Sequence, residues 1–535
     1  MSSVAAPAGS IETKEARRVI FASSLGTVFE WYDFYLYATL APFFAALFFP
    51  PGNATAALLS SFVAYAAGFL VRPFGALFFG RIGDIVGRKY TFLVTIVVMG
   101  SSTAAVGLLP TYQSIGFAAT VLLVLLRLLQ GLALGGEYGG AATYVAEHAP
   151  HGKRGYDTSW IQTTATLGLL LALIVIGVCR VKIPADAFKS WGWRIPFLMS
   201  VILLVFSVYI RLKLQESPIF KAMKEQGKGS KAPLTESFAQ WSNAKIVLLA
   251  LFGATAGQGV VWYAGQFYAL FFLTLYLKVD YLTAYMLIGA SLVIGTPFFI
   301  VFGKLSDKIG RKWIIMAGCL IAALTYFPLF KGLTHYANPT LEAYAANTPI
   351  TVAASDCRMH IFPTPKTVFS PCDKAKDFLT KSGLSFTDLP PVPGETVVTR
   401  IGDIELKGFD DAKYKAALKT GGYPATFDKT QLNWTMTLLI LVILVIYVTM
   451  VYGPIAAFLV ELFPTRIRYT SMSLPYHIGN GWFGGMLPLL ATAIVASRGN
   501  IYAGLWYPII VALMSFVIGS LFIRETKDRD ISHDF

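Results

Sequence analysis

Long apolar runs separated by short polar loops occupy most of the chain. Twelve runs are long enough to cross a membrane as helices, which takes about 20 residues each. Six lie before a polar stretch in the middle of the chain and six lie after it, so the pattern predicts an all-α membrane protein with twelve transmembrane helices in two six-helix bundles. The predicted spans are 19–49, 56–80, 90–109, 114–146, 158–180, 194–213, 246–277, 283–303, 313–331, 433–460, 471–496 and 502–523.

The composition agrees with a membrane protein and argues against a soluble enzyme. Only 14% of the 535 residues are charged, whereas a soluble domain carries about 25%. The formal charge of +14 does not indicate nucleic-acid binding, because the basic residues lie in short loops between apolar runs. We also find no nucleophile–base pair, phosphate loop or metal-ligand spacing, so the sequence predicts neither an enzyme nor a metal site.

The distribution of Lys and Arg predicts the orientation in the membrane. These residues concentrate in the loops on one side, which is expected to be cytoplasmic. The chain therefore divides into a cytoplasmic tail, an N-terminal bundle, a cytoplasmic linker, a C-terminal bundle and a second cytoplasmic tail. Their ranges are 1–18, 19–213, 214–245, 246–523 and 524–535.

One polar loop occurs twice. Residues 80–89 read GRIGDIVGRK and residues 303–312 read GKLSDKIGRK, about 223 residues apart. Glycines permit a tight turn, and the aspartate can accept hydrogen bonds from a helix N-terminus or pair with an arginine. The repeat therefore predicts a cytoplasmic gate, although a simple basic turn that sets topology is an alternative. The predicted gate residues of these loops are Asp84, Gly87, Arg88, Asp307, Gly310 and Arg311.

A second pair of motifs repeats at a different spacing. Glu147 with Arg154 ends the fourth span, and Glu461 with Arg466 ends the tenth, about 314 residues later. This spacing exceeds that of the repeated loops by about 91 residues. The second half therefore contains an insertion of about that length between the two motifs. It is the polar segment 332–432, which the span count places on the non-cytoplasmic side.

The insertion contains two of the four cysteines. Cys357 and Cys372 can form a disulfide if the segment lies in an oxidising compartment such as the bacterial periplasm. The alternative is a pair of free thiols. The pattern leaves open whether the insertion is ordered.

Several ionisable residues fall inside the predicted spans, where a charge is costly unless it faces a cavity or a partner. Glu30, Asp33 and Tyr37 share one helix face. Arg127, Gln130 and Glu137 form one stripe in the fourth span, and Arg72 lies in the second. We expect the acids of the first span to face Arg127 across a central cavity, where a proton and a substrate could compete for them.

Two of these residues also have structural interpretations. Glu137 lies among glycines and can bond a neighbouring helix, and Arg72, which precedes Pro73, can stabilise a helix end. The second half offers neutral groups that could bind a polar solute instead. The candidates there are Gln258, Gln266, Tyr476 and Asn480.

The doubled loop resembles the signature of the major facilitator superfamily. Four further segments narrow the resemblance to the metabolite:proton symporter family, which includes carriers for citrate, 2-oxoglutarate, shikimate, and proline or betaine. They are EWYDF at 30–34, RLLQGLALGGEYGG at 127–140, WGWRIPF at 191–197 and ESPIF at 216–220. The resemblance implies two parallel six-helix bundles that work by alternating access, and it places an arginine at Arg127 in the cavity. The insertion departs from the common family pattern.

The leading hypothesis is a proton-coupled symporter of a small carboxylate or zwitterion, which uses the proton gradient and needs no cofactor. An exporter on the same fold, working by proton antiport, and a transporter-like receptor are the alternatives. The expected setting is the bacterial inner membrane, with both termini cytoplasmic. The expected partners are a solute, protons and lipid, and the chain is expected to be monomeric.

Overall fold

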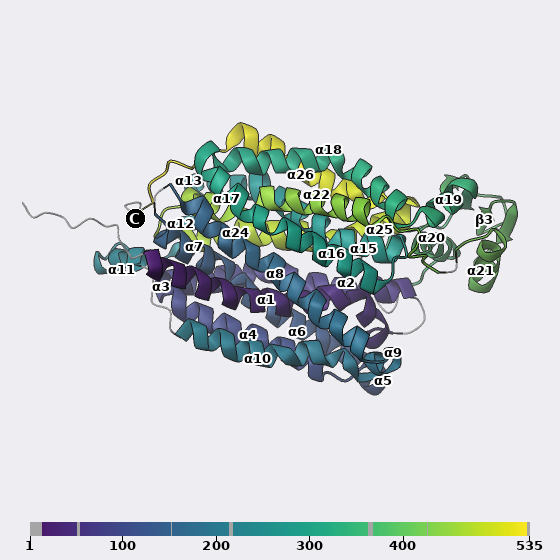
Figure 1. Ribbon diagram of the computed structural model, residues 1–535, viewed down its shortest axis with the longest axis horizontal. Helices are drawn as coiled ribbons and strands as arrows, with labels where there is room; N and C mark the ends of the chain where they lie inside the picture. Colours follow the sequence, from purple (N-terminus) through teal and green to yellow (C-terminus); the bar gives the residue numbers. More distant parts are fainter. Residues whose placement is uncertain are drawn as a thin grey trace, which may run out of the picture.

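The computed structural model describes residues 13–50, 54–150, 152–212, 218–361, 367–424 and 426–531. Residues 1–12 of the predicted tail 1–18, residues 214–217 of the linker 214–245 and residues 532–535 of the tail 524–535 lie outside these ranges. Helices run along the long axis of the molecule, and the insertion projects from one end (Figure 1).

The first bundle contains the six predicted spans. The second and fourth spans are each built from two consecutive helices, and the remaining spans are single helices. In order they are α1 (Thr13–Phe48), α2 (Ala54–Leu70) with α3 (Arg72–Ile85), α4 (Arg88–Leu108), α6 (Phe117–Gly135) with α7 (Tyr138–His148), α8 (Arg154–Lys182) and α10 (Arg194–Leu212).

The second bundle repeats this arrangement with more broken helices. Its seventh span is α13 (Trp241–Ala250), η2 (Leu251–Thr255), α14 (Ala256–Tyr263), η3 (Ala264–Tyr268), α15 (Ala269–Phe271) and η4 (Phe272–Tyr276). The others are α16 (Tyr281–Gly295) with α17 (Pro297–Ile309), α18 (Arg311–Ala337), α22 (Trp434–Tyr452) with α23 (Ile455–Leu462), α24 (Arg468–His477) with η5 (Ile478–Gly485) and α25 (Leu487–Arg498), and α26 (Trp506–Phe522).

The helix breaks have local causes. Pro73 and Pro297 occupy the first turn of α3 and α17, where a missing N–H costs nothing. Pro42 lies inside α1, which runs through it. Stretches of π-helix in the seventh and eleventh spans shift the register of the residues that follow. Ten helical segments are long and apolar enough to cross a membrane, and α4 carries a shorter apolar stretch, Leu93–Leu108, among the residues described.

The insertion folds into a small α/β unit. It contains α19 (Pro339–Asn347), α20 (Pro371–Lys381), α21 (Asp411–Thr420) and the strands β1 (Ile350–Ala354), β2 (Thr387–Leu389), β3 (Val397–Ile401) and β4 (Ile404–Lys407). The strand order is β2-β1-β3-β4, with β1 and β2 parallel and the other pairs antiparallel. The all-α prediction therefore holds for the membrane part, and the insertion adds a sheet that the sequence analysis did not predict.

The insertion has its own apolar core and rests on the second bundle. Val352, Leu379 and Tyr414 belong to this core, which is separate from that of the bundles. The amide of Phe386 donates to the carbonyl of Gly499 at 2.8 Å, next to α25. Because α18 continues to Ala337, the insertion starts later than the predicted residue 332.

The two bundles meet along several helix pairs. Those in closest contact are α8 with α17, α3 with α24, and α8 with α16. The end of the bundles near α3, α7 and α12 (Pro233–Phe238) lies opposite the insertion (Figure 1). We call this the network end, because it carries the polar contacts described next.

Candidate functional site

The two repeated loops form matching turns at the network end. Gly87 and Gly310 have φ values of 143° and 109° and immediately precede α4 and α18. Residues that carry a side chain rarely adopt this backbone conformation, so the turn requires glycine at both places. The aspartate of each loop lies three residues earlier, inside the preceding helix.

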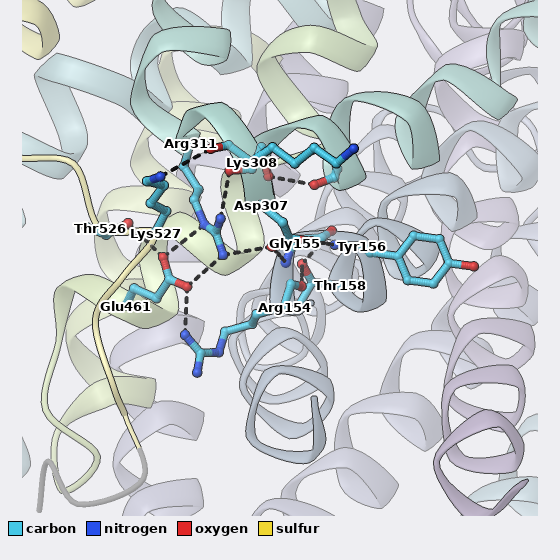
Figure 2. A network of polar contacts seen from close by, with 12 residues as sticks. Arg154, Gly155, Tyr156, Thr158, Asp307, Lys308, Arg311, Glu461, Thr526 and Lys527 are labelled. Carbon is cyan, nitrogen blue, oxygen red and sulfur yellow. Dashed lines mark hydrogen bonds and ion pairs between the residues drawn. The ribbon is translucent and has the colours of Figure 1, made fainter. Parts of the chain in front are cut away.

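Each of these aspartates caps a helix of the opposite bundle. Asp84 accepts from the amide and the hydroxyl of Thr470, at 3.0 and 2.7 Å, in the first turn of α24. Asp307 accepts from the amides of Gly155 and Tyr156, at 2.8 and 2.9 Å, in the first turn of α8 (Figure 2). A carboxylate is favourable there, because the free amides and the helix dipole both attract it. The repeat thus builds two equivalent contacts that join the bundles.

The second pair of motifs adds two buried ion pairs between the bundles. Arg154 of α8 pairs with Glu461 of α23 at 2.7 Å, and Arg468 of α24 pairs with Glu147 of α7 at 3.1 Å. Arg311 also reaches Glu461 at 3.1 Å (Figure 2). All of these side chains are buried.

Glu147 pairs with Arg468, which the sequence analysis did not select. Arg466, the arginine that it named as a gate residue beside Glu461, is partly exposed and pairs with Glu236, near the end of the linker, at 3.1 Å. The repeat spacing does indicate Arg468 as the counterpart of Arg154, because these two residues are separated by the same 314 residues as Glu147 and Glu461. Arg88, another predicted gate residue, has its side chain outside the described residues.

Arg72 occupies a different environment, between the bundles. It is fully buried, and its guanidinium carbon lies 4.3 and 4.1 Å from the ring centroids of Phe34 and Phe69. Tyr263 and His477 of the second bundle lie within electrostatic range of it. Among the described residues, no nitrogen of Arg72 or of the His477 ring has a hydrogen-bond partner in good geometry. Burial of a cation without a paired carboxylate is costly.

Arg127 is held inside the first bundle. It donates to Gln130 at 2.5 Å, and Gln130 donates to Thr103 at 2.7 Å. Its guanidinium also lies over the rings of Phe34 and Tyr37, at 4.9 and 4.6 Å. Two members of the predicted stripe, Arg127 and Gln130, therefore contact each other, and Arg127 also contacts Tyr37 of the first span.

Asp33 does not face Arg127, contrary to the sequence hypothesis. It accepts a hydrogen bond from Ser200 of α10 at 2.5 Å, and it is buried. The reason is helix geometry: the ring of the next residue, Phe34, covers Arg127, and one residue earlier along a helix points about 100° away. The side chain of Glu30 lies outside the described residues.

Glu137 forms a structural contact within the first bundle. It pairs with Arg211 at the end of α10 at 3.3 Å, and both side chains are buried. This matches the interpretation of Glu137 as a bond to a neighbouring helix. Arg211 had no predicted role.

The neutral candidates of the second bundle separate into paired and unpaired groups. Gln258 and Asn480 bond each other twice, at 3.0 and 2.9 Å. Gln266 is buried, and neither polar atom of its amide has a hydrogen-bond partner among the described residues. Tyr476 shares a hydrogen bond of 2.7 Å with Tyr452. Gln266 is therefore the candidate amide for which no hydrogen bond is described.

Aromatic rings from both bundles meet in the centre, and of those named here the sequence analysis selected only Tyr476. Tyr35 stacks on Trp262 with ring centroids 5.6 Å apart, and Tyr138 stacks on Tyr476 at 3.5 Å. The only signal in the sequence was the position of Tyr35 one helical turn after Trp31, which also stacks on Trp262. Of these rings, that of Tyr35 lies within electrostatic range of Arg72.

The predicted disulfide is present. Cys357 and Cys372 are bonded, and the other two cysteines, Cys179 and Cys319, are free and buried. The bond joins the segment after β1 to the first turn of α20.

Comparisons with known proteins agree with this architecture. Residues 19–245 match the family model described as "Sugar (and other) transporter". A Haemophilus influenzae protein with the provisional name metabolite transport protein is 33% identical over 96% of this chain and 96% of its own length. A Staphylococcus aureus protein, provisionally named a proline/betaine transporter, is 36% identical over 98% of this chain and 92% of its own.

Two further similarities concern proteins of the same general type. The shikimate transporter of Escherichia coli is 34% identical over 61% of this chain and 74% of its own. The solved structure of the proton:xylose symporter XylE bound to 6-bromo-6-deoxy-D-glucose superimposes with a TM-score of 0.65, at 15% identity, over 97% of this chain and 98% of that one. That similarity concerns the fold alone.

Two six-helix bundles, the doubled gate loop and full-length relatives above 30% identity thus lead to one conclusion. The chain is a multi-pass membrane transporter that belongs to the major facilitator superfamily and, within it, to the metabolite:proton symporter family.

Proposed function

We propose that the chain imports a small organic solute with a carboxylate group, by symport with protons, and that Arg72 binds this carboxylate. The observation that carries the proposal is the guanidinium of Arg72, which is buried between the bundles, has no hydrogen bond in good geometry and contacts no carboxylate among the described residues. An arginine matches a carboxylate with two parallel hydrogen bonds. Proline, betaine and shikimate, which appear in the names of relatives, all carry that group.

The surroundings of Arg72 suit an amphipathic solute. The rings of Phe34 and Phe69, which lie beside its guanidinium, offer apolar surface for a carbon skeleton. No acidic side chain is described in contact with Arg72, so a solute anion would not compete with a resident carboxylate.

Asp33 is the group best placed to carry the proton. Its carboxyl group is buried against a single hydroxyl, that of Ser200. A charge in this setting is expensive, whereas a protonated carboxyl group is tolerated. Proton loss from Asp33 would therefore require rearrangement or solvent entry, which couples the proton to the conformational cycle. The proton gradient is the only energy source in this scheme, and no cofactor takes part.

The network end acts as the cytoplasmic gate in this proposal. Its ion pairs and helix caps join the bundles and close that side, so opening toward the cytoplasm must break them. The opposite end, with the disulfide-containing insertion, then faces the periplasm, where disulfides persist. Both termini lie in the cytoplasm of a bacterial inner-membrane protein that works as a monomer.

The test is uptake into proteoliposomes with an imposed pH gradient. A labelled panel of carboxylates, zwitterions and neutral sugars is compared with and without a protonophore. We expect accumulation of one or more carboxylates, its loss with protonophore, and a loss of about 100-fold in Arg72→Gln, because a hydrogen bond to a charged group contributes about 1.5–3 kcal/mol.

A matched variant controls for the loss of one arginine. Arg400→Gln changes an exposed arginine of the insertion, paired with Glu405, and should leave uptake unchanged. Asp33→Asn should abolish accumulation but retain exchange of internal for external solute. Undiminished carboxylate uptake by Arg72→Gln, or gradient-driven export as the sole activity, would contradict the proposal.

A further inference from the structure

An apolar groove lies between the bundles, on the lipid-facing side of α8 and α16. It has a volume of about 460 Å³, and its walls include Ile174 and Val178 of α8 and Met286 of α16. These three side chains are 52, 55 and 48% exposed. The two helices lie side by side in Figure 1, toward the end that carries the insertion.

The groove exists because the two spans touch at one end and part at the other. At the network end, a Cβ added to Gly155 of α8 would lie 2.6 Å from the carbonyl oxygen of Gly303 of α17, so the backbones are in contact. In the groove, a Cβ added to Gly177 of α8 would meet nothing within 4 Å. One added to Gly289 of α16 would meet only Leu170, at 3.5 Å. Small residues thus leave open space where larger ones would fit.

Two cations lie at the end of the groove remote from the network. Lys182 lines it directly, and Arg180 lies over the ring of Tyr281 at 4.6 Å and that of Phe188 at 5.1 Å. The Nε of Arg180 has no hydrogen-bond partner among the described residues. The helix dipole favours cations at the end of α8, but it does not account for the apolar channel that leads away from them.

We propose that this groove binds a phospholipid, with one acyl chain between α8 and α16 and its phosphate at Lys182 and Arg180. Phospholipids combine an apolar chain with an anionic phosphate at the depth where these cations lie, and basic pockets between transmembrane helices bind such head groups. A transported carboxylate fits less well, because the walls described are apolar apart from Lys182 and Tyr285.

The position of the groove makes its occupancy depend on conformation. The groove opens at the end opposite the network, whose contacts are closed in this structure. Alternating access, as proposed above, requires the bundles to approach at that end when the network opens. A lipid in the groove therefore opposes this movement and favours the state with the network closed.

The test is native mass spectrometry of the delipidated full-length protein titrated with palmitoyl-oleoyl phosphatidylglycerol. We expect at least one retained lipid. Gly177→Leu fills the empty space and should remove that lipid. The double variant Arg180→Gln and Lys182→Gln should bind it about 25-fold more weakly, since each cation near a head group contributes about fivefold.

Two control variants separate this site from general lipid contact. Val205→Leu enlarges a lipid-facing residue of α10, and Lys189→Gln removes a cation outside the groove; both should retain the lipid. Equal occupancy in all variants, or equal displacement by an uncharged maltoside detergent, would overturn the proposal. Occupancy is measured without transport, so a failed uptake experiment leaves this test intact.

Discussion

The network end and the centre of the molecule both bury arginines, but they differ in whether a carboxylate contacts them. At the network end, Arg154, Arg311 and Arg468 each contact a carboxylate. In the centre, the guanidinium of Arg72 lies against the rings of Phe34 and Phe69, and no carboxylate is described in contact with it. Paired charges of this kind hold two surfaces together, whereas an unpaired buried charge favours the binding of an ion. In the function proposed above, this difference separates the gate from the binding site.

The largest expected effect comes from breaking the network. Glu461→Gln leaves Arg154 and Arg311 without their shared carboxylate, and removal of one partner from a buried pair costs about 3–5 kcal/mol. Because these ion pairs join the bundles when the network is closed, their loss destabilises the closed state. The network end should therefore open more often. Hydrogen exchange of residues 154–162 should accelerate strongly.

Glu405→Gln is the matched control for this prediction. Glu405 pairs with Arg400 on the exposed surface of the insertion, where an ion pair contributes little. Exchange at residues 154–162 should not change in this variant. Equal exchange in both variants would show that the ion pairs do not hold the gate.

The second prediction concerns stability at Arg72. Arg72→Met removes a buried charge without leaving an ionised partner behind. In the absence of solute, its free energy of unfolding should therefore equal that of the parent protein or exceed it by about 1 kcal/mol, and its thermal midpoint should not fall. Uptake should be lost. Arg468→Met, by contrast, strands Glu147 and should lower the midpoint, as measured by thermal unfolding in detergent.

A double variant that removes both charges of the Glu147–Arg468 pair tests the same difference between paired and unpaired arginines. Glu147→Leu combined with Arg468→Met removes both partners and should recover most of the stability that Arg468→Met loses. A fall in stability for Arg72→Met as large as that for Arg468→Met would mean that Arg72 has a resident partner.

A smaller effect is expected at the gate turn. Gly310→Ala forces a side chain into a backbone conformation that glycine alone tolerates, at about 1–3 kcal/mol, and its Cβ would meet Glu525. Gating should loosen, as seen by faster exchange at the start of α8. Gly422→Ala, also at positive φ but with no atom near its Cβ, should leave that exchange unaltered.

The smallest effect concerns the insertion, which lies outside the membrane. Burial alone would raise the pKa of Asp373, but hydrogen bonds from the amides of Arg358 and Ser370 and from His360 outweigh it and lower the pKa below 3.8. Since the folded pKa lies below the unfolded one, the stabilisation is present above the unfolded pKa and is lost as the pH falls through the folded value.

Limited proteolysis of the insertion should therefore become faster below about pH 4, and Asp373→Asn should remove that dependence. The same acid sensitivity in the variant would assign the effect to other groups.

The sequence predicted the membrane architecture well because span length and loop charge are local properties. Ten of the twelve spans match segments that satisfy length and hydropathy among the described residues. The repeat also selected Asp84 and Asp307, since both loops keep the same residues at the same positions. The same repeat also predicts Arg468, because it lies 314 residues after Arg154.

The sequence by itself determined twelve spans, the doubled gate loop and the charges that the membrane interior must accommodate. Only the tertiary structure decided which charges pair, because helices distant in sequence supply the partners: Ser200 for Asp33, Arg211 for Glu137, and no described group for Arg72. A helical pattern indicates which residues share a face. It does not indicate which helix covers that face, since this depends on the packing of all twelve.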